Sequence, residues 1–197
     1  TGTIYGAHLS LCTRYIDRFG SGEQRAKYVP GLASGNQIGA FALTEAEAGS
    51  DAAAIKTTVQ DAPDGFKLSG TKMFITNGEQ ASTFVVMATR DAASRDRGIE
   101  TFIVGRDYLG ITITPQHGKM GMKGCATAEL VFEDCRIPVG NRLGEEGEGY
   151  RIALKILDSS RIMIAAQCLG LAKGAYEAAL SYSKQRETFG RPIATRQ

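Results

Sequence analysis

The sequence lacks the features that mark several classes of function. Its 23 basic and 21 acidic residues nearly balance, and no run of lysine or arginine is interleaved with aromatics, which argues against a nucleic-acid surface. No apolar run approaches membrane-spanning length. The four cysteines form no CxxC pair and do not cluster with His8 or His117, which argues against zinc and favours buried free thiols in a reducing compartment.

The two ends of the chain also lack the usual signals. The sequence begins at Thr1 without a methionine and stops at Gln197 without a stop signal, so we interpret the 197 residues as a piece of a longer protein. No signal peptide is visible, although a missing start could conceal one.

Apolar periodicity predicts helices near both ends. Apolar residues recur over Tyr5–Phe19, and Ser21 is a fair N-cap for a second helix that ends at Val29-Pro30-Gly31. A long helix is expected over Tyr150–Gln185. Because few charges interrupt its centre, further helices must cover this helix inside a bundle.

Between these helices, short β-branched and aromatic runs separated by turns predict an all-β middle part. The expected strands are Ile38–Leu43, Ile55–Gln60, Phe66–Thr71, Phe84–Thr89, Thr101–Val104, Ile111–Thr114 and Ala128–Phe132, with Asp91–Gly98 as an exposed loop. No intervening helix is long enough for a parallel crossover. The fold class is therefore α+β, with an antiparallel β-barrel or sandwich flanked by helical segments.

A strand that leads into a small-residue, hydroxyl-rich turn predicts a ligand site. Ile38–Leu43 is followed by Thr44 and then by Gly49, Ser50 and Asp51. Glycine permits a close approach to the backbone, and such a turn can offer N–H groups to an anion. The alternative is a plain tight turn, which is common in loops of every function.

A second segment, Lys72–Gly78, supplies an aromatic ring and a hydroxyl. Phe74 and Thr76 are two residues apart, so on an extended segment they face the same side. Together with Thr44 and Ser50 they provide what a flat heteroaromatic cofactor needs, namely a ring that covers one face and hydroxyls that bond the edge atoms.

Phe41–Asp51 and Lys72–Gly78 resemble the flavin-binding motifs of the acyl-CoA dehydrogenase family, especially its short-chain or butyryl-CoA members. Many members carry Trp where Phe74 stands and Pro where Ala46 stands, so an aromatic cover is retained while the turn is less rigid. The resemblance implies the end of an N-terminal helical domain over 1–37, a middle β-domain over 38–139 and the start of a C-terminal helical bundle over 140–197.

The resemblance also implies particular binding residues. The flavin of FAD would be contacted by Phe41, Leu43, Thr44, Gly49, Ser50, Phe74, Ile75 and Thr76, and FAD on a neighbouring subunit would be reached by Arg186, Thr188, Phe189 and Gln197. The acyl-CoA would be contacted by Ser50, Asp158, Ser159, Ser160 and Arg161. The alternatives are an i,i+3 ion pair between Asp158 and Arg161, and an ordinary helix C-terminus with favourable cations around Arg186.

Gln167 is a long polar side chain in the small and apolar stretch Ala165–Gly170, where an unpaired amide would be costly. One explanation is a hydrogen bond to a neighbouring helix. The other, implied by the resemblance, is that Gln167 closes the floor of a short acyl pocket.

The implied activity is FAD-dependent α,β-dehydrogenation of a short-chain acyl-CoA, with electrons passed to an electron-transfer flavoprotein by a homotetramer in the bacterial cytoplasm or mitochondrial matrix. The family's catalytic glutamate is expected beyond Gln197, and the position that a minority of members use is Ser160 here. No catalytic residue is therefore expected in this chain, and the fragment alone should be inactive. The alternatives are an acyl-CoA oxidase or nitroalkane-oxidising relative, and a non-catalytic flavin-binding module.

Overall fold

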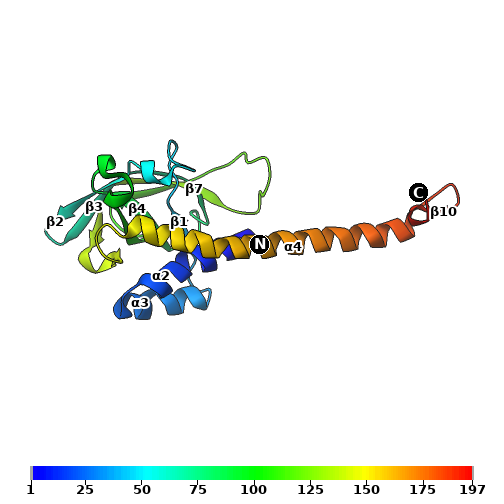
Figure 1. Cartoon of the computed structure of the whole chain (residues 1–197), viewed down its shortest axis with the longest axis horizontal. Helices are drawn as coiled ribbons and strands as arrows, with labels where there is room; N and C mark the ends of the chain where they lie inside the picture. Colours follow the sequence, from blue (N-terminus) through cyan, green and yellow to red (C-terminus); the bar gives the residue numbers. More distant parts are fainter. Residues whose placement is uncertain (1, 197) are drawn as a thin grey trace. The chain divides into compact units, whose positions relative to one another are not determined.

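The computed structural model describes residues 2–196 and divides the chain into two compact units, Thr1–Ser160 and Arg161–Gln197 (Figure 1). The first unit contains a strongly curled β-sheet and the N-terminal helices. The second contains the later part of the long helix and a short hairpin. The α+β fold class is confirmed.

The N-terminal helical segment is not one regular α-helix. It consists of α1 (Gly2–Gly6), a π-helical stretch η1 (Ala7–Thr13) and α2 (Arg14–Phe19). A π-helix widens the backbone turn and often marks a functional position. The periodicity over Tyr5–Phe19 therefore located the segment correctly but did not reveal its changed pitch.

The second helix, α3 (Gly22–Ala33), begins with the expected cap. Ser21 accepts a hydrogen bond from the backbone N–H of Gln24, whose side chain bonds back to the Ser21 N–H. The predicted end at Val29-Pro30-Gly31 is wrong, because the helix continues through Pro30 to Ala33. A proline this close to the C-terminal end removes only one N–H donor, and the Pro30 carbonyl still accepts from the Ser34 N–H at 3.1 Å.

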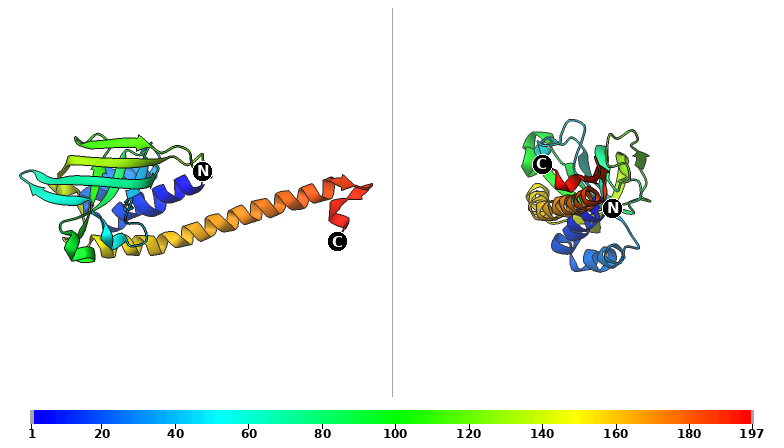
Figure 2. Two further views of the ribbon diagram at one scale, coloured as in Figure 1. Left: turned by 90° about the horizontal axis from the view of Figure 1, so that it is seen from above. Right: turned by 90° about the vertical axis from the view of Figure 1, so that its right-hand side faces the viewer.

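The strands of the first unit form a curled sheet beside the N-terminal helices (Figure 2). The order of the sheet is β6-β7-β3-β2-β4-β5-β8, with β1 paired to β4. The strands are β1 (Gly39–Ala42), β2 (Thr58–Ala62), β3 (Gly65–Thr76), β4 (Thr83–Thr89), β5 (Ile99–Gly105), β6 (Ile111–Pro115), β7 (Thr127–Pro138) and β8 (Arg142–Leu143). Most neighbours are antiparallel, but β1 and β2 both run parallel to β4. The β2–β3 hairpin, rather than a helix, makes this crossover, so the sequence pattern did not reveal it.

Several strand limits differ from the predicted ones. β3 and β7 are longer because they pair along most of their lengths. Lys56 and Thr57 do not join β2, since their N–H groups donate to the Glu45 carboxylate instead. The expected loop at Asp91–Gly98 contains a 3-10 segment, η3 (Ala92–Gly98), and is exposed. Two further 3-10 turns, η2 (Ala52–Ala54) and η4 (Val139–Asn141), complete the connections.

Strand β4 is the centre of the first unit because all seven of its residues are buried. Successive side chains of a strand point to opposite faces of the sheet, so the alternate side chains of β4 belong to two different cores. Val85 and Met87 pack against the N-terminal helices and the start of the long helix α4 (Gly149–Gln185). Phe84, Val86 and Ala88 pack inside the curled sheet.

The beginning of α4 is fixed closely against β5. The Tyr15 hydroxyl lies 2.7 Å from the Thr101 hydroxyl and 3.4 Å from the Gly149 carbonyl oxygen. Gly149 leaves no room for a side chain, since a Cβ there would lie 2.7 Å from backbone atoms of Glu100. Ile152 and Ile156 then bury one face of the first turns of α4.

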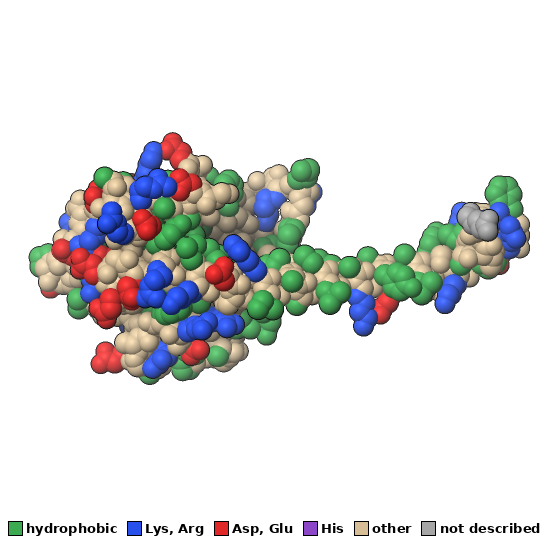
Figure 3. Space-filling view, in the orientation of Figure 1, with side chains coloured by type: hydrophobic (Ala, Val, Ile, Leu, Met, Phe, Trp, Pro, Cys, Tyr) green, Lys and Arg blue, Asp and Glu red, His purple; other side chains and the backbone are tan. Residues whose placement is uncertain are grey.

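The second unit presents apolar side chains to solvent. From Arg161 to Gln185, no described residue of α4 is buried, and its most exposed large apolar side chains include Ile162, Leu169 and Tyr176. Apolar side chains are visible along this part of the helix (Figure 3). The unit ends in the hairpin β9 (Glu187–Thr188) and β10 (Arg191–Pro192), followed by η5 (Ile193–Thr195). Among residues 2–196, no helix has the length and apolarity required to cross a membrane.

The expectation of buried thiols holds for three of the four cysteines. Cys12, Cys125 and Cys135 are buried in the first unit, whereas Cys168 is exposed. Cys168 belongs to the part of α4 in which no described residue is buried, so the prediction is wrong there.

A buried ion pair joins the turn after β1 to β3. Lys72 on β3 is fully buried, and its Nζ lies 2.8 Å from Oε1 of Glu45. Burial lowers the pKa of Lys72 to about 8, with Glu45 opposing the shift, so this side chain stays protonated in acid. Burial raises the pKa of Glu45, but the charge of Lys72 and hydrogen bonds from Lys72, Thr57 and Lys56 together lower it below its usual value.

We predict that Gly149→Ala destabilises the protein by about 1–3 kcal/mol, because the new methyl group forces α4 away from β5. Gly140→Ala is the matched control, since nothing lies within 4 Å of its added Cβ. Urea unfolding of the two variants measures the difference. Equal free energies of unfolding would contradict the tight packing at Gly149.

We also predict an acid sensitivity that depends on Glu45. Because its folded-state pKa is lowered, the stabilisation that it contributes is fully present above the reference value of 4.5 and is lost as the pH falls through the folded value. Glu45→Gln should therefore lose less unfolding free energy than the wild type between pH 6 and pH 3. Urea midpoints at each pH give the slopes, with the exposed Glu47→Gln as control. Parallel slopes in all three proteins would refute the assignment.

Candidate functional site

A cavity of about 320 Å³ in the first unit gathers most of the residues predicted to contact a flavin. It lies where the turn after β1 meets the end of β3. Its lining comprises Ala7, Leu11, Phe41, Leu43, Thr44, Gly49, Phe74, Ile75, Thr76 and Leu157. Seven of these ten residues come from the two predicted binding segments, so two segments that are far apart in the chain line one cavity, which we call the cleft.

The turn that forms one wall of the cleft is closed by its own backbone. Glu45 and Ala48 exchange two N–H to carbonyl bonds, at 3.1 and 3.2 Å, and Gly49 follows directly. The Met73 N–H donates to the Thr44 carbonyl at 2.9 Å, which joins this wall to β3. The wall therefore has a fixed position relative to the strand opposite.

Asp51, at the end of the predicted anion-binding turn, has a partner within the protein. Its carboxylate accepts two hydrogen bonds from the Arg95 guanidinium, at 2.7 and 3.0 Å. Both side chains are more than half exposed, so the pair contributes little stability. Ser50 is exposed beside Gly49 but is not part of the lining.

Phe74 has an unusual backbone conformation in the opposite wall. Its φ is +58°, a left-handed value that is uncommon for a bulky residue, and its exposure is 62%. The register of β3 against β7 shifts between Lys72 and Ile75, which is the sign of a β-bulge. Phe74 and Thr76 both line the cleft, as expected of two residues on one face of the segment. Ile75 also lines the cleft but is buried, and it packs in the core inside the sheet. Strain that exposes an aromatic side chain favours a binding function.

The strained segment is anchored just beyond Thr76. The Asn77 side chain donates to the carbonyl oxygens of Ile4 at 3.0 Å and Gly39 at 3.3 Å. Its backbone N–H donates to Ala126 at 2.9 Å. Asn77 thus ties the end of β3 to α1, to β1 and to the start of β7.

Three lining residues were missed by the sequence analysis. Ala7 and Leu11 come from the π-helical stretch, and Leu157 comes from α4. Each is one member of an ordinary apolar pattern, so nothing in the sequence distinguishes it from a core residue. His8, next to Ala7, is structural: its Nδ1 accepts from the Gly39 N–H, and its Nε2 donates to the Leu32 carbonyl, each at 2.9 Å.

The chemistry of the cleft suits a flat heteroaromatic group. Phe41, Phe74 and aliphatic residues give the lining its apolar part, and Thr44 and Thr76 are its hydroxyl-bearing residues. Apolar walls with a few placed polar groups are typical of cofactor sites. Among the described residues, no three His, Cys, Asp or Glu side chains gather closely enough to hold a metal ion.

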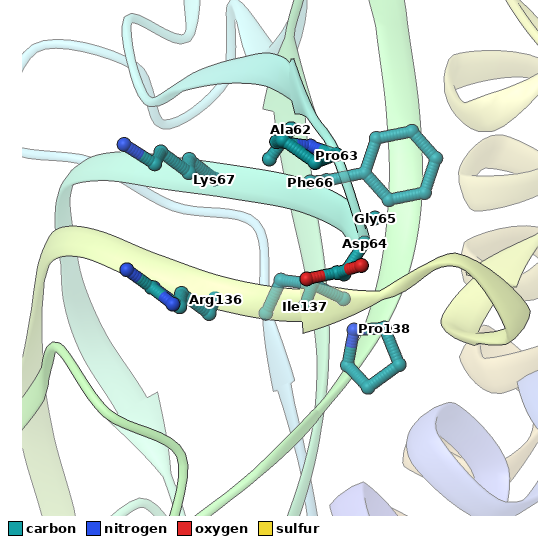
Figure 4. A pocket seen from close by; sticks show the side chains of 9 residues that line it. All are labelled: Ala62, Pro63, Asp64, Gly65, Phe66, Lys67, Arg136, Ile137 and Pro138. Carbon is teal, nitrogen blue, oxygen red and sulfur yellow. The ribbon is translucent and has the colours of Figure 1, made fainter.

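A second cavity, of about 390 Å³, lies at the β2–β3 hairpin and the end of β7 (Figure 4). Lys67 and Arg136 are cross-strand neighbours there and extend side by side, while the Phe66 ring packs 5.0 Å from the ring of Phe102. Its lining includes neither of the two predicted binding segments. We therefore assign the candidate site to the cleft.

The other predicted residues lie outside the cleft. Ser159 and Ser160 end the first unit, and their hydroxyls donate to carbonyls of α4 three residues earlier. Asp158 is exposed beside them. Arg161 and Gln167 belong to the second unit, as do Arg186, Thr188 and Phe189, while Gln197 lies outside the described residues.

The hairpin of the second unit forms a small local cluster. Phe189 is 94% exposed and lies under the Arg196 guanidinium, 4.9 Å from it. Arg196 also donates to the Thr188 carbonyl. Arg186 immediately precedes β9, and its carbonyl accepts from the Ile193 N–H at 2.9 Å.

The chain is similar to known proteins over its whole length. It is 45% identical to the short-chain specific acyl-CoA dehydrogenase of Clostridium acetobutylicum, over 98% of this chain and 51% of that protein. It is also similar to the structure of butyryl-CoA dehydrogenase from Megasphaera elsdenii, with a TM-score of 0.95 and 42% identity, over 98% of this chain and 51% of that one. A third similar chain comes from the structure of the electron transferring flavoprotein of Acidaminococcus fermentans. Its TM-score is 0.96 and its identity 47%, over 99% of this chain and 51% of that one.

Three family models match successive parts of the sequence. The N-terminal domain of acyl-CoA dehydrogenase matches residues 1–36, its middle domain residues 40–135 and its C-terminal domain residues 147–197. The chain spans about half the length of the curated relatives it matches. With all three models matched in order, the chain belongs to the acyl-CoA dehydrogenase family, whose members are FAD-dependent oxidoreductases.

Proposed function

We propose that the complete protein is an FAD-dependent dehydrogenase that converts a short-chain acyl-CoA thioester to the enoyl-CoA. The observation that carries this proposal is the cleft, in which Phe74 is held exposed by a strained bulge opposite Thr44 and Gly49. Similarity to short-chain and butyryl-CoA dehydrogenases supports the substrate class.

The chemistry needs a base for the α proton, an acceptor for the β hydride and donors for the developing enolate oxygen. Bound FAD supplies the hydride acceptor, because amino-acid side chains cannot. The residues of this chain bind and orient: Phe41 and Phe74 cover ring faces, and the hydroxyls of Thr44 and Thr76 bond edge atoms. Leu11 and Leu157 exclude water from the apolar side of the cleft.

The remaining parts of the proposal concern the complete assembly. Arg186, Thr188, Phe189 and Gln197 bind the diphosphate and adenosine of FAD on a neighbouring subunit of a homotetramer. Ser50 and the segment 158–161 contact the acyl-CoA, and the domains divide near residues 37 and 139. The exposed apolar side chains of α4 support a helical partner for the second unit.

We further propose a base and an electron acceptor that are not among the 197 residues. The proposed base is a glutamate beyond Gln197, and the proposed acceptor is an electron-transfer flavoprotein, supported by similarity to a chain in a structure of that name. The proposed location is the bacterial cytoplasm or the mitochondrial matrix. Rapid reoxidation of the reduced enzyme by oxygen would instead favour the acyl-CoA oxidase alternative.

Arg186→Ala in the complete protein should weaken FAD binding, because it removes a charge-assisted pair with the diphosphate. The expected loss is about 1.5–3 kcal/mol. Equilibrium titration of apoprotein with FAD measures it, and Lys184→Ala is a control for an exposed cation near the same helix end. Equal FAD affinity of the Arg186 variant and the wild type, with folding intact, would reject this role.

The wild-type enzyme should prefer four- to six-carbon acyl-CoA substrates. The Gln167 side chain, as the floor of the acyl pocket, would discriminate against longer acyl chains by roughly 1–3 kcal/mol. Gln167→Gly should therefore shift activity toward longer substrates. Ratios of kcat/KM for butyryl- and octanoyl-CoA test this, and Ala166→Gly controls for glycine in the helix. Equal kcat/KM values for butyryl- and octanoyl-CoA in the wild type would reject the short pocket, whatever the variant does.

A further inference from the structure

The buried ion pair between Lys72 and Glu45 joins the two walls of the cleft, and each of its residues is close in sequence to one wall. Glu45 directly follows Leu43 and Thr44 of one wall. Lys72 precedes Phe74, Ile75 and Thr76 of the other. Neither charged side chain lines the cavity, so the pair acts on the cleft through the backbone on either side of it.

Lys72 holds the first wall through two acceptors. Its Nζ donates to Oε1 of Glu45 at 2.8 Å and to the Leu43 carbonyl at 3.0 Å. The next residue, Met73, donates its N–H to the Thr44 carbonyl at 2.9 Å. Two consecutive residues of β3 therefore bind three consecutive residues of the turn, which fixes their relative register.

Glu45 also closes the far end of the same loop. Its Oε2 accepts from the Lys56 N–H at 2.6 Å and its Oε1 from the Thr57 N–H at 3.0 Å. The loop between Glu45 and Lys56 contains Gly49 and Ser50. One carboxylate thus determines where this loop starts, where it ends and how it faces β3.

A contact that served only to fill the core would not need charges. Well-packed apolar residues can replace a buried ion pair without loss of stability, because burial of each charge is costly. An ion pair with directional hydrogen bonds does what an apolar contact cannot, since it selects one register and one orientation.

We propose that Lys72 and Glu45 are positioning residues that set the separation between the Thr44–Gly49 wall and the Phe74–Thr76 wall, so that the cleft holds a flat heteroaromatic cofactor. The inference rests on the proposed function, because the cofactor in question is the flavin of FAD. Removal of both charges should then impair cofactor binding even where the protein remains folded.

The test uses the complete protein with the double substitution Lys72→Met and Glu45→Leu, which leaves no buried charge unpaired. The matched control is Lys56→Met with Glu47→Leu, which removes an exposed ion pair from the same loop. The readouts are FAD affinity of the apoprotein, the visible spectrum of bound flavin and the thermal midpoint. We expect the double variant to bind FAD at least tenfold more weakly and to shift the flavin spectrum, while the control matches the wild type.

Wild-type affinity and spectrum in the folded double variant would overturn the inference and leave the proposed function intact. If the double variant does not fold, Glu45→Gln replaces it, because the amide keeps the volume and one acceptor oxygen. A folded Glu45→Gln protein with unchanged flavin spectrum and affinity would equally overturn the inference. A wild-type protein that binds no FAD would overturn the proposed function together with this inference.

Discussion

Two opposite charges buried away from water hold the turn after β1 against β3, and the candidate site depends on that contact. Strand β1 is itself fixed by its parallel pairing with β4, whose side chains belong to both cores of the first unit. The turn must leave this rigid strand and still meet β3. Lys72 and Glu45 make that connection without occupying the cavity.

Strain and support occur together in the opposite wall. The bulge at Phe74 exposes an aromatic ring at an unfavourable φ, and such a conformation persists only where its surroundings over-determine it. Lys72 fixes the chain before the bulge, and the three hydrogen bonds that Asn77 donates fix it after the bulge. The cleft is therefore preformed by the protein, which lowers the cost of ordering it around a ligand.

Local patterns in the sequence were enough to predict most strands, the capping box at Ser21 and seven of the ten residues that line the cleft. The missed features depend on tertiary contacts. A π-helical stretch at Ala7–Thr13 has the same apolar pattern as an α-helix, and the bulge at Phe74 follows from the register with β7. The pairing of Lys72 with Glu45 joins residues 27 positions apart, so no local pattern reports it. The binding roles of the second unit's residues stay predictions, because the apolar face of its helix is exposed over residues 161–185.

We propose that the cleft between the turn after β1 and the bulge of β3 holds a flavin that oxidises an acyl thioester. The most direct measurement is an anaerobic titration of the complete, purified protein with butyryl-CoA, followed by the visible absorption of bound flavin. We expect a yellow protein whose flavin absorption bleaches as the thioester is added. A colourless protein that does not take up FAD, or a flavin that stays oxidised at saturating butyryl-CoA, would contradict it.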